Sequence, residues 1–151
     1  MNKSLEWSWK TFDQLSKHEL YEALQFRQSI FVVEQQSWYL DADGLDEFSH
    51  HLLVKKNEIL KGYLRLTPPG KKYKVPSIGR IAVQEEMRGN NFGHEIVNEG
   101  LIKSNAIYNS AESRISAQQY LIKFYEKHGF EVEGDIYDED GIPHVQMVKN
   151  G

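Results

Sequence analysis

The strongest structural signal in this sequence is Ile78-Gly-Arg-Ile-Ala-Val83, followed after four residues by Arg88-Gly-Asn-Asn-Phe-Gly-His94. The two segments predict a strand, a turn that contains glycine, and the start of a helix. Such a turn directs several backbone N–H groups and the positive end of the helix at one point, which suits a phosphate group. Gly89 and Gly93 lack a Cβ atom, so the backbone there can approach a ligand oxygen and adopt a positive φ.

Other interpretations of this turn stay open. Asn and Gly also suit an ordinary strand-to-helix bend that binds nothing. Arg88 and His94, on either side of the turn, supply charge or hydrogen-bond donors for a phosphate. The turn is not a P-loop, because no Lys-Ser or Lys-Thr pair follows a glycine. It is not a dinucleotide-binding fingerprint either, because the third glycine and the acidic ribose partner are missing.

A second informative segment is Lys123-Phe-Tyr-Glu-Lys-His-Gly-Phe130. It predicts the end of a helix, with Gly129 as the residue that terminates it. Tyr125 lies near this helix end. A tyrosine here is either a core or rim residue that satisfies its hydroxyl, or an acid, since a phenol keeps its proton at neutral pH.

The composition limits the function classes. The 151 residues fit one domain, which we place at residues 1–151, and 40% apolar residues suffice for its core. A net charge of −4 argues against a general nucleic-acid binder. The lack of cysteine excludes disulfides, thiolate metal sites and a cysteine nucleophile. No signal peptide and no apolar run of about 20 residues is visible, so we expect a cytoplasmic protein without membrane contact.

Hydrophobic periodicity and turn signals predict an α/β (α+β) fold, a mixed sheet with helices on both faces. Ser16 and Glu19 form a predicted capping box at the first helix. Gly100 is a weak helix former, so we expect it to pack closely against the sheet. The predicted strands are 5–9, 51–56, 59–67, 75–83, 114–117, 131–137 and 144–148, the helices are 16–34, 93–108 and 118–128, and residues 35–48 form a loop.

The two motifs together resemble the GNAT superfamily of N-acetyltransferases. Arg88-Gly-Asn-Asn-Phe-Gly93 is similar to its acyl-CoA signature, Gln/Arg-x-x-Gly-x-Gly/Ala, and Phe124-Tyr-Glu-Lys-His-Gly-Phe130 to its later helix motif. Phe31-Val-Val-Glu-Gln35 and Glu139-Asp-Gly-Ile-Pro-His144 are similar to the ElaA-type branch. The resemblance implies a mostly antiparallel, twisted sheet. Asn91 replaces the first glycine of the signature, and because Asn tolerates the left-handed region, we expect the turn to be kept.

The resemblance also implies a cosubstrate, acetyl-CoA, and roles for particular residues. Tyr125 occupies the position of the acid that protonates the departing thiol. A backbone amide of the Ile81–Val83 strand is expected to form the oxyanion hole. Gln118 occupies the place of an Asn that contacts the cofactor in many relatives. The residues expected around the pantetheine arm and the diphosphate are Ile81, Ala82, Val83, Arg88, Gly89, Asn90, Asn91, Phe92, Gly93 and His94.

The general base has several candidates. Glu34 ranks first, because it follows the apolar Phe31-Val-Val33, a setting that raises a carboxyl pKa. His144 ranks second, ahead of His50 and His51, because imidazole titrates near neutral pH. A chain of water molecules is a further alternative. The adjacent His50 and His51 point to opposite faces of a strand and cannot chelate one metal together, so no metal site is predicted.

The acceptor is expected to be the primary amine of a small molecule or peptide, attacked directly in a ternary complex because there is no cysteine for an acyl-enzyme. The acidic stretch Asp41–Glu47 is either a solvated loop or a surface for the acceptor cation. Trp38 and Tyr39 either line the acceptor pocket or anchor this loop. A homodimer is consistent with related enzymes. The alternatives to an enzyme are a non-catalytic CoA sensor and an interaction module.

Overall fold

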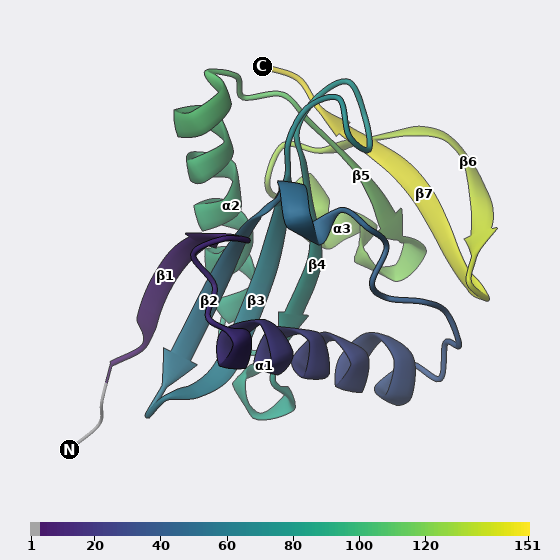
Figure 1. Ribbon diagram of the computed structural model, residues 1–151. Helices are drawn as coiled ribbons and strands as arrows, with labels where there is room; N and C mark the ends of the chain where they lie inside the picture. Colours follow the sequence, from purple (N-terminus) through teal and green to yellow (C-terminus); the bar gives the residue numbers. More distant parts are fainter. Residues whose placement is uncertain (1–3) are drawn as a thin grey trace.

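Four antiparallel strands in the order β1-β2-β3-β4 form the first sheet of the computed structural model, which describes residues 4–151 (Figure 1). The turn at Asn57-Glu58 joins two of them in the predicted hairpin, and both residues have positive φ. The strands are β1 (Glu6–Thr11), β2 (His50–Lys56), β3 (Ile59–Thr67) and β4 (Ser77–Val83).

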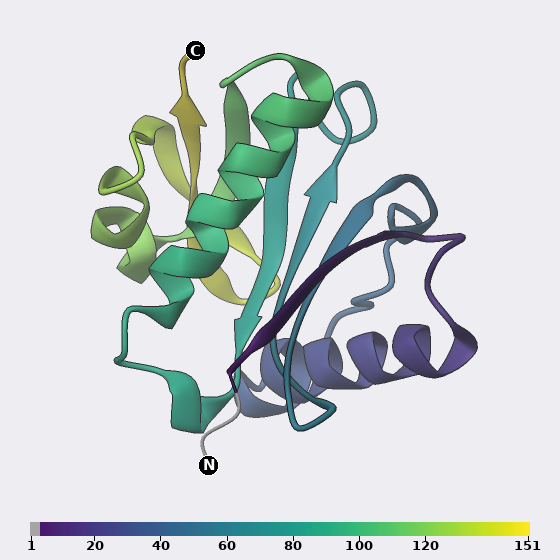
Figure 2. The ribbon, with the colours of Figure 1, turned by 90° about the vertical axis from the view of Figure 1, so that its left-hand side faces the viewer.

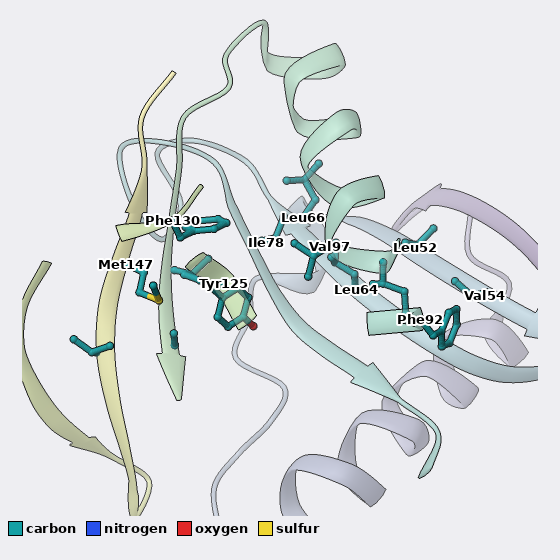
Figure 3. Packing of buried hydrophobic residues seen from close by; sticks show 14 residues of the cluster. Leu52, Val54, Leu64, Leu66, Ile78, Phe92, Val97, Tyr125, Phe130 and Met147 are labelled. Atoms are coloured by element: carbon teal, nitrogen blue, oxygen red, sulfur yellow. The ribbon is translucent and has the colours of Figure 1, made fainter. Parts of the chain in front are cut away.

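The remaining three strands form the second sheet, in the antiparallel order β5-β7-β6. They are β5 (Ser113–Gln118), β6 (Glu131–Glu139) and β7 (Ile142–Lys149). β4 and β5 adjoin at their beginnings, where the Arg114 amide donates to the Pro76 carbonyl at 3.2 Å. Further along they belong to separate sheets and move apart (Figure 3). We call the region between the diverging C-terminal halves of these two strands the gap.

The two longer helices cover opposite faces of the first sheet (Figure 2). α1 (Lys17–Gln28) begins with the predicted capping box: the Glu19 amide donates to Ser16 Oγ at 3.0 Å, and the Ser16 amide donates to Glu19 Oε1 at 2.9 Å. α1 continues as a π-helix over Ser29–Glu34, so the helical region ends where the periodicity placed it. α2 (Phe92–Tyr108) packs on the other face.

The largest hydrophobic cluster extends from the first sheet and α2 to the second sheet (Figure 3). It includes Phe130 and Met147, so the cluster joins both sheets. Gly100 faces this cluster as expected, because a Cβ atom there would lie 2.8 Å from Leu64 Cδ1 and 3.2 Å from Ile78 Cγ2. The absence of a side chain lets α2 approach β3 and β4 closely.

Gly100→Ala should lower the free energy of unfolding by up to about 2 kcal/mol, since overpacking a core costs about 1–3 kcal/mol and the gain in helix propensity offsets about 1. Leu64 and Ile78 are buried and have little room to move. Urea unfolding measures the change. Gly79→Ala is the control, because its Cβ atom would meet nothing within 4 Å. A Gly100→Ala protein more stable than wild type would contradict the expected overpacking.

The predicted helix over residues 118–128 is wrong at its start. Gln118 is the last residue of β5, paired with His144 of β7, and a 3-10 turn over Gln119–Leu121 precedes α3 (Ile122–Glu126). The residues have good helix propensity, but pairing with β7 outweighs it at Gln118. The predicted end at Gly129 is confirmed by its φ of +91°. Among the described residues, no helix has the length and apolarity needed to cross a membrane.

Candidate active site

Tyr125 of α3 lies beside the gap between β4 and β5. Its ring is buried, edge-on to Phe124 and Phe130 at centroid distances of 5.1 Å and 5.9 Å. Figure 3 shows the hydroxyl oxygen on the side of β4. Burial raises the pKa of Tyr125 well above its usual value, so the phenol holds its proton at neutral pH. The side chain is therefore part of the core and keeps a protonated hydroxyl.

The β4 wall of the gap contains a bulge. Tyr63 of β3 pairs with Ala82 and Arg65 pairs with Gly79, so the register leaves Arg80 and Ile81 without partners on β3. Arg80 has a φ of +48°, which is unusual for a residue with a side chain. Such an irregularity leaves backbone groups of Arg80 and Ile81 outside the ladder.

The turn before α2 has the backbone conformation that the phosphate motif requires. Asn91 has a φ of +66°, so the expectation that asparagine replaces the signature glycine in the left-handed region is confirmed. Gly89 also has a positive φ, of +83°. Gly93 differs from the prediction: it lies inside α2 without a positive φ, and a Cβ atom there would lie 3.4 Å from the Phe124 ring. At this distance a Cβ atom would make an ordinary van der Waals contact with the ring.

The first turn of α2 has free backbone donors. The Asn91 side chain caps none of them in the described chain, and the first amide bonded to Asn91 is that of Glu95, at 3.1 Å. The N–H groups of Phe92, Gly93 and His94 therefore remain at the positive end of a helix of 17 residues. Together with the left-handed turn, these donors fit a diphosphate.

Arg88 does not point freely toward this turn. Its Nε donates to the Val83 carbonyl at 3.0 Å, and its guanidinium binds both carboxylate oxygens of Glu34 at 2.9 Å and 3.1 Å. The prediction of an apolar setting for Glu34 is wrong, because its side chain is 42% exposed and paired with an arginine. The ion pair with Arg88 thus holds the Glu34 carboxylate at a partly exposed position.

The segment after the π-helix is hydrogen-bonded to the end of β5 and to the β6–β7 turn. The side-chain amides of Gln35 and Gln118 donate to each other: Gln35 Nε2 to Gln118 Oε1 at 3.4 Å, and Gln118 Nε2 to Gln35 Oε1 at 3.2 Å. Ser37 Oγ donates to the Asp140 carbonyl of the β6–β7 turn at 2.8 Å. Gln118, predicted to contact the cofactor, thus ties β5 to the segment after α1. Glu34 through Ser37 connect β4, β5 and the β6–β7 hairpin.

His94 connects the two helices beside the gap. Its ring stacks on Phe124 at 4.3 Å, and its Nδ1 forms a 2.9 Å hydrogen bond with Nε2 of His128. Burial lowers the pKa of His128, and the nearby His94 and Lys149 lower it further. His94 was predicted to lie beside the diphosphate, and its contact with His128 was not predicted, because a contact between helices is not visible in the spacing.

His144, the second candidate base, lies at the end of the gap on the sheet face opposite Tyr125. It is the β7 partner of Gln118, and its neighbour Val145 points into the core. Nδ1 lies 2.7 Å from the Ile142 carbonyl, and Nε2 lies 3.2 Å from Glu139 Oε2. His51 is excluded as a free base, because its nitrogens contact the Tyr63 hydroxyl and the Asp46 carbonyl.

The acidic loop is not a solvated loop throughout. Asp41 and Asp46 are buried and pair with Arg27 at 2.9 Å and 2.7 Å. Arg65 binds Asp43 through both oxygens, at 2.7 Å and 2.8 Å, and Arg80 contacts Asp41 at 2.8 Å. We call these six residues the arginine–aspartate network. It anchors residues 41–46 on the α1 face of the first sheet. None of the three arginines was predicted from the sequence to have a role.

Trp38 and Tyr39 have different environments. Trp38 is 77% exposed, on the loop between the Ser37 and Asp41 anchors. Tyr39 packs under the Arg80 guanidinium at 5.7 Å from its ring centroid. Tyr39 thus anchors the loop, and Trp38 remains available to a ligand.

The stability of the protein should fall in acid through this network. Burial alone would raise the pKa of Asp43, but hydrogen bonds and charge from Arg65 hold it well below its usual range. A carboxyl with a lowered folded-state pKa stabilises the fold above its unfolded pKa of about 3.9, and this contribution is lost as pH falls through the folded-state pKa. Urea unfolding from pH 6 to pH 3 should show a fall in stability that is smaller in Asp43→Asn. Glu47→Gln, at an exposed position, should keep the wild-type slope; an equal slope in Asp43→Asn would refute this role.

Comparison with known proteins agrees with this geometry. The acetyltransferase (GNAT) domain family matches residues 17–150. A UPF0039 protein of Synechocystis is 42% identical over 145 residues, which cover 95% of this chain and 94% of the relative. The ElaA protein of Escherichia coli is 34% identical over 147 residues, 96% of each chain.

Solved structures share the whole architecture. A crystal structure of an acyl-CoA N-acyltransferase from Pseudomonas aeruginosa superimposes with a TM-score of 0.92 at 35% identity and covers 97% of this chain and 99% of its own. The E. coli ElaA crystal structure gives a TM-score of 0.91 at 33% identity and covers 97% and 100%. The predicted α+β fold is thereby confirmed. The chain belongs to the GNAT acetyltransferase superfamily, with the ElaA and UPF0039 proteins as its relatives.

Proposed function

We propose that this protein transfers an acetyl group from acetyl-CoA to the primary amine of an acceptor. The GNAT fold implies the binding of an acyl-CoA. The observation that carries the proposal is the buried Tyr125 phenol beside the gap between β4 and β5, close to a left-handed turn with free helix amides. A CoA sensor has no need of a proton donor at the thioester.

Three parts of the chain have separate tasks in this reaction. The amides of Phe92, Gly93 and His94 hold the diphosphate. A backbone amide at the Arg80–Ile81 bulge stabilises the oxyanion. Tyr125 donates its proton to the departing sulfur, because sulfur leaves more easily as a thiol than as a thiolate. The acetyl group passes directly to the amine, because the chain has no cysteine to carry it.

Binding and turnover are tested separately. Acetyl-CoA should bind in calorimetry and release free thiol with members of a panel of polyamines, aminoglycosides, amino acids and peptides. Binding without thiol release in every case would favour a sensor. No binding would refute the proposal.

Asn91→Val should weaken acetyl-CoA binding by about tenfold or more, because a β-branched residue resists φ near +66° and the turn would reorganise. Calorimetry measures the affinity. Asn109→Val is the matched control: Asn109 has a φ of +51° at the other end of the same helix. This control should share the backbone strain and keep the affinity. Equal affinities of the two variants would remove the turn from the binding site.

A further inference from the structure

The second sheet has a polar face opposite the hydrophobic cluster. Val145 and Met147 of β7 point into that cluster, so His144 and Gln146 point to the other side. Their strand partners are Ser116 and Gln118 on β5 and Tyr137 on β6. Ser116, Tyr137 and Glu139 have no role in the reaction proposed above.

Hydrogen bonds on this face fix the Glu139 carboxylate. Ser116 Oγ donates to Glu139 Oε1 at 3.0 Å and is itself bonded to the Tyr137 hydroxyl. The Tyr137 hydroxyl accepts from Gln146 Nε2 at 2.9 Å. The chain of bonds occupies one oxygen of Glu139. The other oxygen, Oε2, lies 3.2 Å from Nε2 of His144.

This contact brings two acceptors together when the imidazole is neutral. Nδ1 of His144 lies 2.7 Å from the Ile142 carbonyl, which only accepts, so Nδ1 carries the hydrogen. The lone pair of the neutral ring is then on Nε2, directed at a carboxylate oxygen. A group with two or more N–H donors and a positive charge satisfies both acceptors. An alkylammonium ion has these properties.

The Glu139–His144 pair also lies near the end of β5. His144 pairs with Gln118 at the end of β5, beside the gap, while Tyr125 lies on the core side of the same sheet. The Glu139 side chain is 44% exposed and the His144 side chain 8% exposed. An ammonium group can thus reach the carboxylate from solvent, with the imidazole behind it.

We propose that Glu139 and His144 bind the ammonium group of the acceptor and remove its proton; this inference rests on the proposed transfer reaction. One N–H bond of the ammonium breaks and an Nε2–H bond forms on His144, next to the Glu139 carboxylate that stabilises the imidazolium. The amine keeps the electron pair and forms the C–N bond. The C–S bond breaks, and sulfur takes the electron pair and the Tyr125 proton.

The protons balance in this scheme. The nitrogen loses a second proton as the amide forms, and this proton replaces the one given by Tyr125. The proton on His144 passes to solvent and is the net product. Ser116 and Tyr137 are positioning residues, because they hold the carboxylate without touching the amine. The acceptor class is a cationic primary amine, and an acceptor that is neutral at pH 7 does not need the pair.

Other charged groups surround Glu139. The Glu139 charge acts on Lys72 and Tyr73 of the β3–β4 connection. Burial raises the pKa of Tyr73, and the Glu139 carboxylate adds to the rise. An ammonium group bound to Glu139 would therefore share the field of this carboxylate with Lys72.

Nuclear magnetic resonance tests the site without turnover. The ¹⁵N and ¹³C signals of the His144 ring should shift on titration with n-butylammonium chloride. Glu139→Gln keeps the side-chain size and should abolish the response. Glu133→Gln is the matched control, because Glu133 lies on the same strand and pairs with Arg114 instead. An unresponsive His144 in the wild-type protein would overturn the inference even if the enzyme is active.

Kinetics test the proton transfer. With n-butylamine, Glu139→Gln should raise KM about tenfold, and His144→Gln should lower kcat about 10²- to 10⁴-fold. With hydroxylamine, which is neutral at pH 7, both variants should transfer nearly as fast as the wild type. Equal losses with both amines would assign His144 a structural role. A wild-type protein that acetylates no amine but shows the His144 response would fault the proposed function and leave the ammonium site standing.

Discussion

Tyr125→Phe should lower kcat for acetyl transfer by about 10²- to 10⁴-fold while leaving acetyl-CoA affinity nearly unchanged. The substitution removes only the hydroxyl. The ring keeps its contacts with Phe124 and Phe130, so the core and the cofactor turn should keep their geometry. Burial raises the pKa of Tyr125, and the wild-type phenol therefore holds the proton that the sulfur needs.

Steady-state kinetics, calorimetry with CoA and thermal unfolding separate the possible roles of this residue. Tyr21→Phe is the matched control, since Tyr21 lies on α1 and is 70% exposed. This control should behave like the wild-type protein in all three measurements. If Tyr125→Phe lost affinity and turnover equally, the hydroxyl would have a packing role and a different proton donor would be needed.

The backbone of the candidate site follows closely from the sequence. A strand, a turn with glycine and a helix start were readable from local spacing, and the positive φ of Asn91 follows from the tolerance of asparagine for that region. The capping box of α1 joins residues only three positions apart. Such features depend on neighbours in the chain, so local chemistry determines them.

The side-chain partners of the site do not follow from local spacing. Glu34 and Arg88 are 54 positions apart, and Ser37 and Asp140 are 103 positions apart. Each pair exists because the strands bring distant segments together. The prediction of an apolar setting for Glu34 used its three preceding residues and missed an arginine from another part of the chain.

One of these long-range contacts, that of Arg27, was nevertheless indicated by the sequence. Ala23, Phe26 and Ile30 form the buried stripe of the first helix, and Arg27 lies on that stripe, four positions after Ala23 and three before Ile30. A buried guanidinium requires anionic partners. The acidic residues that follow the helix are the nearest ones in sequence, so the pattern indicated a network rather than a solvated loop.

Arg27→Met should lower the free energy of unfolding by about 3–5 kcal/mol, because it breaks two buried ion pairs and leaves Asp41 with only Arg80, and Asp46 with only Arg65, as charged partners. Arg27 is 1% exposed, and methionine fills similar space without the charge. Burial opposes its charged form, yet the surrounding acids and Tyr63 raise the pKa of Arg27, so the residue is charged in the folded protein. Urea unfolding at low temperature keeps a destabilised variant measurable.

A double-mutant cycle identifies the source of this loss. Asp46→Asn should also destabilise, and combining it with Arg27→Met should cost less than the sum, because the neutral pair leaves fewer buried charges unpaired. Lys55→Met removes the cation of a surface pair with Glu22 at 3.2 Å and should change stability by at most about 1 kcal/mol. If Arg27→Met cost no more than this surface control, the network would not anchor the loop.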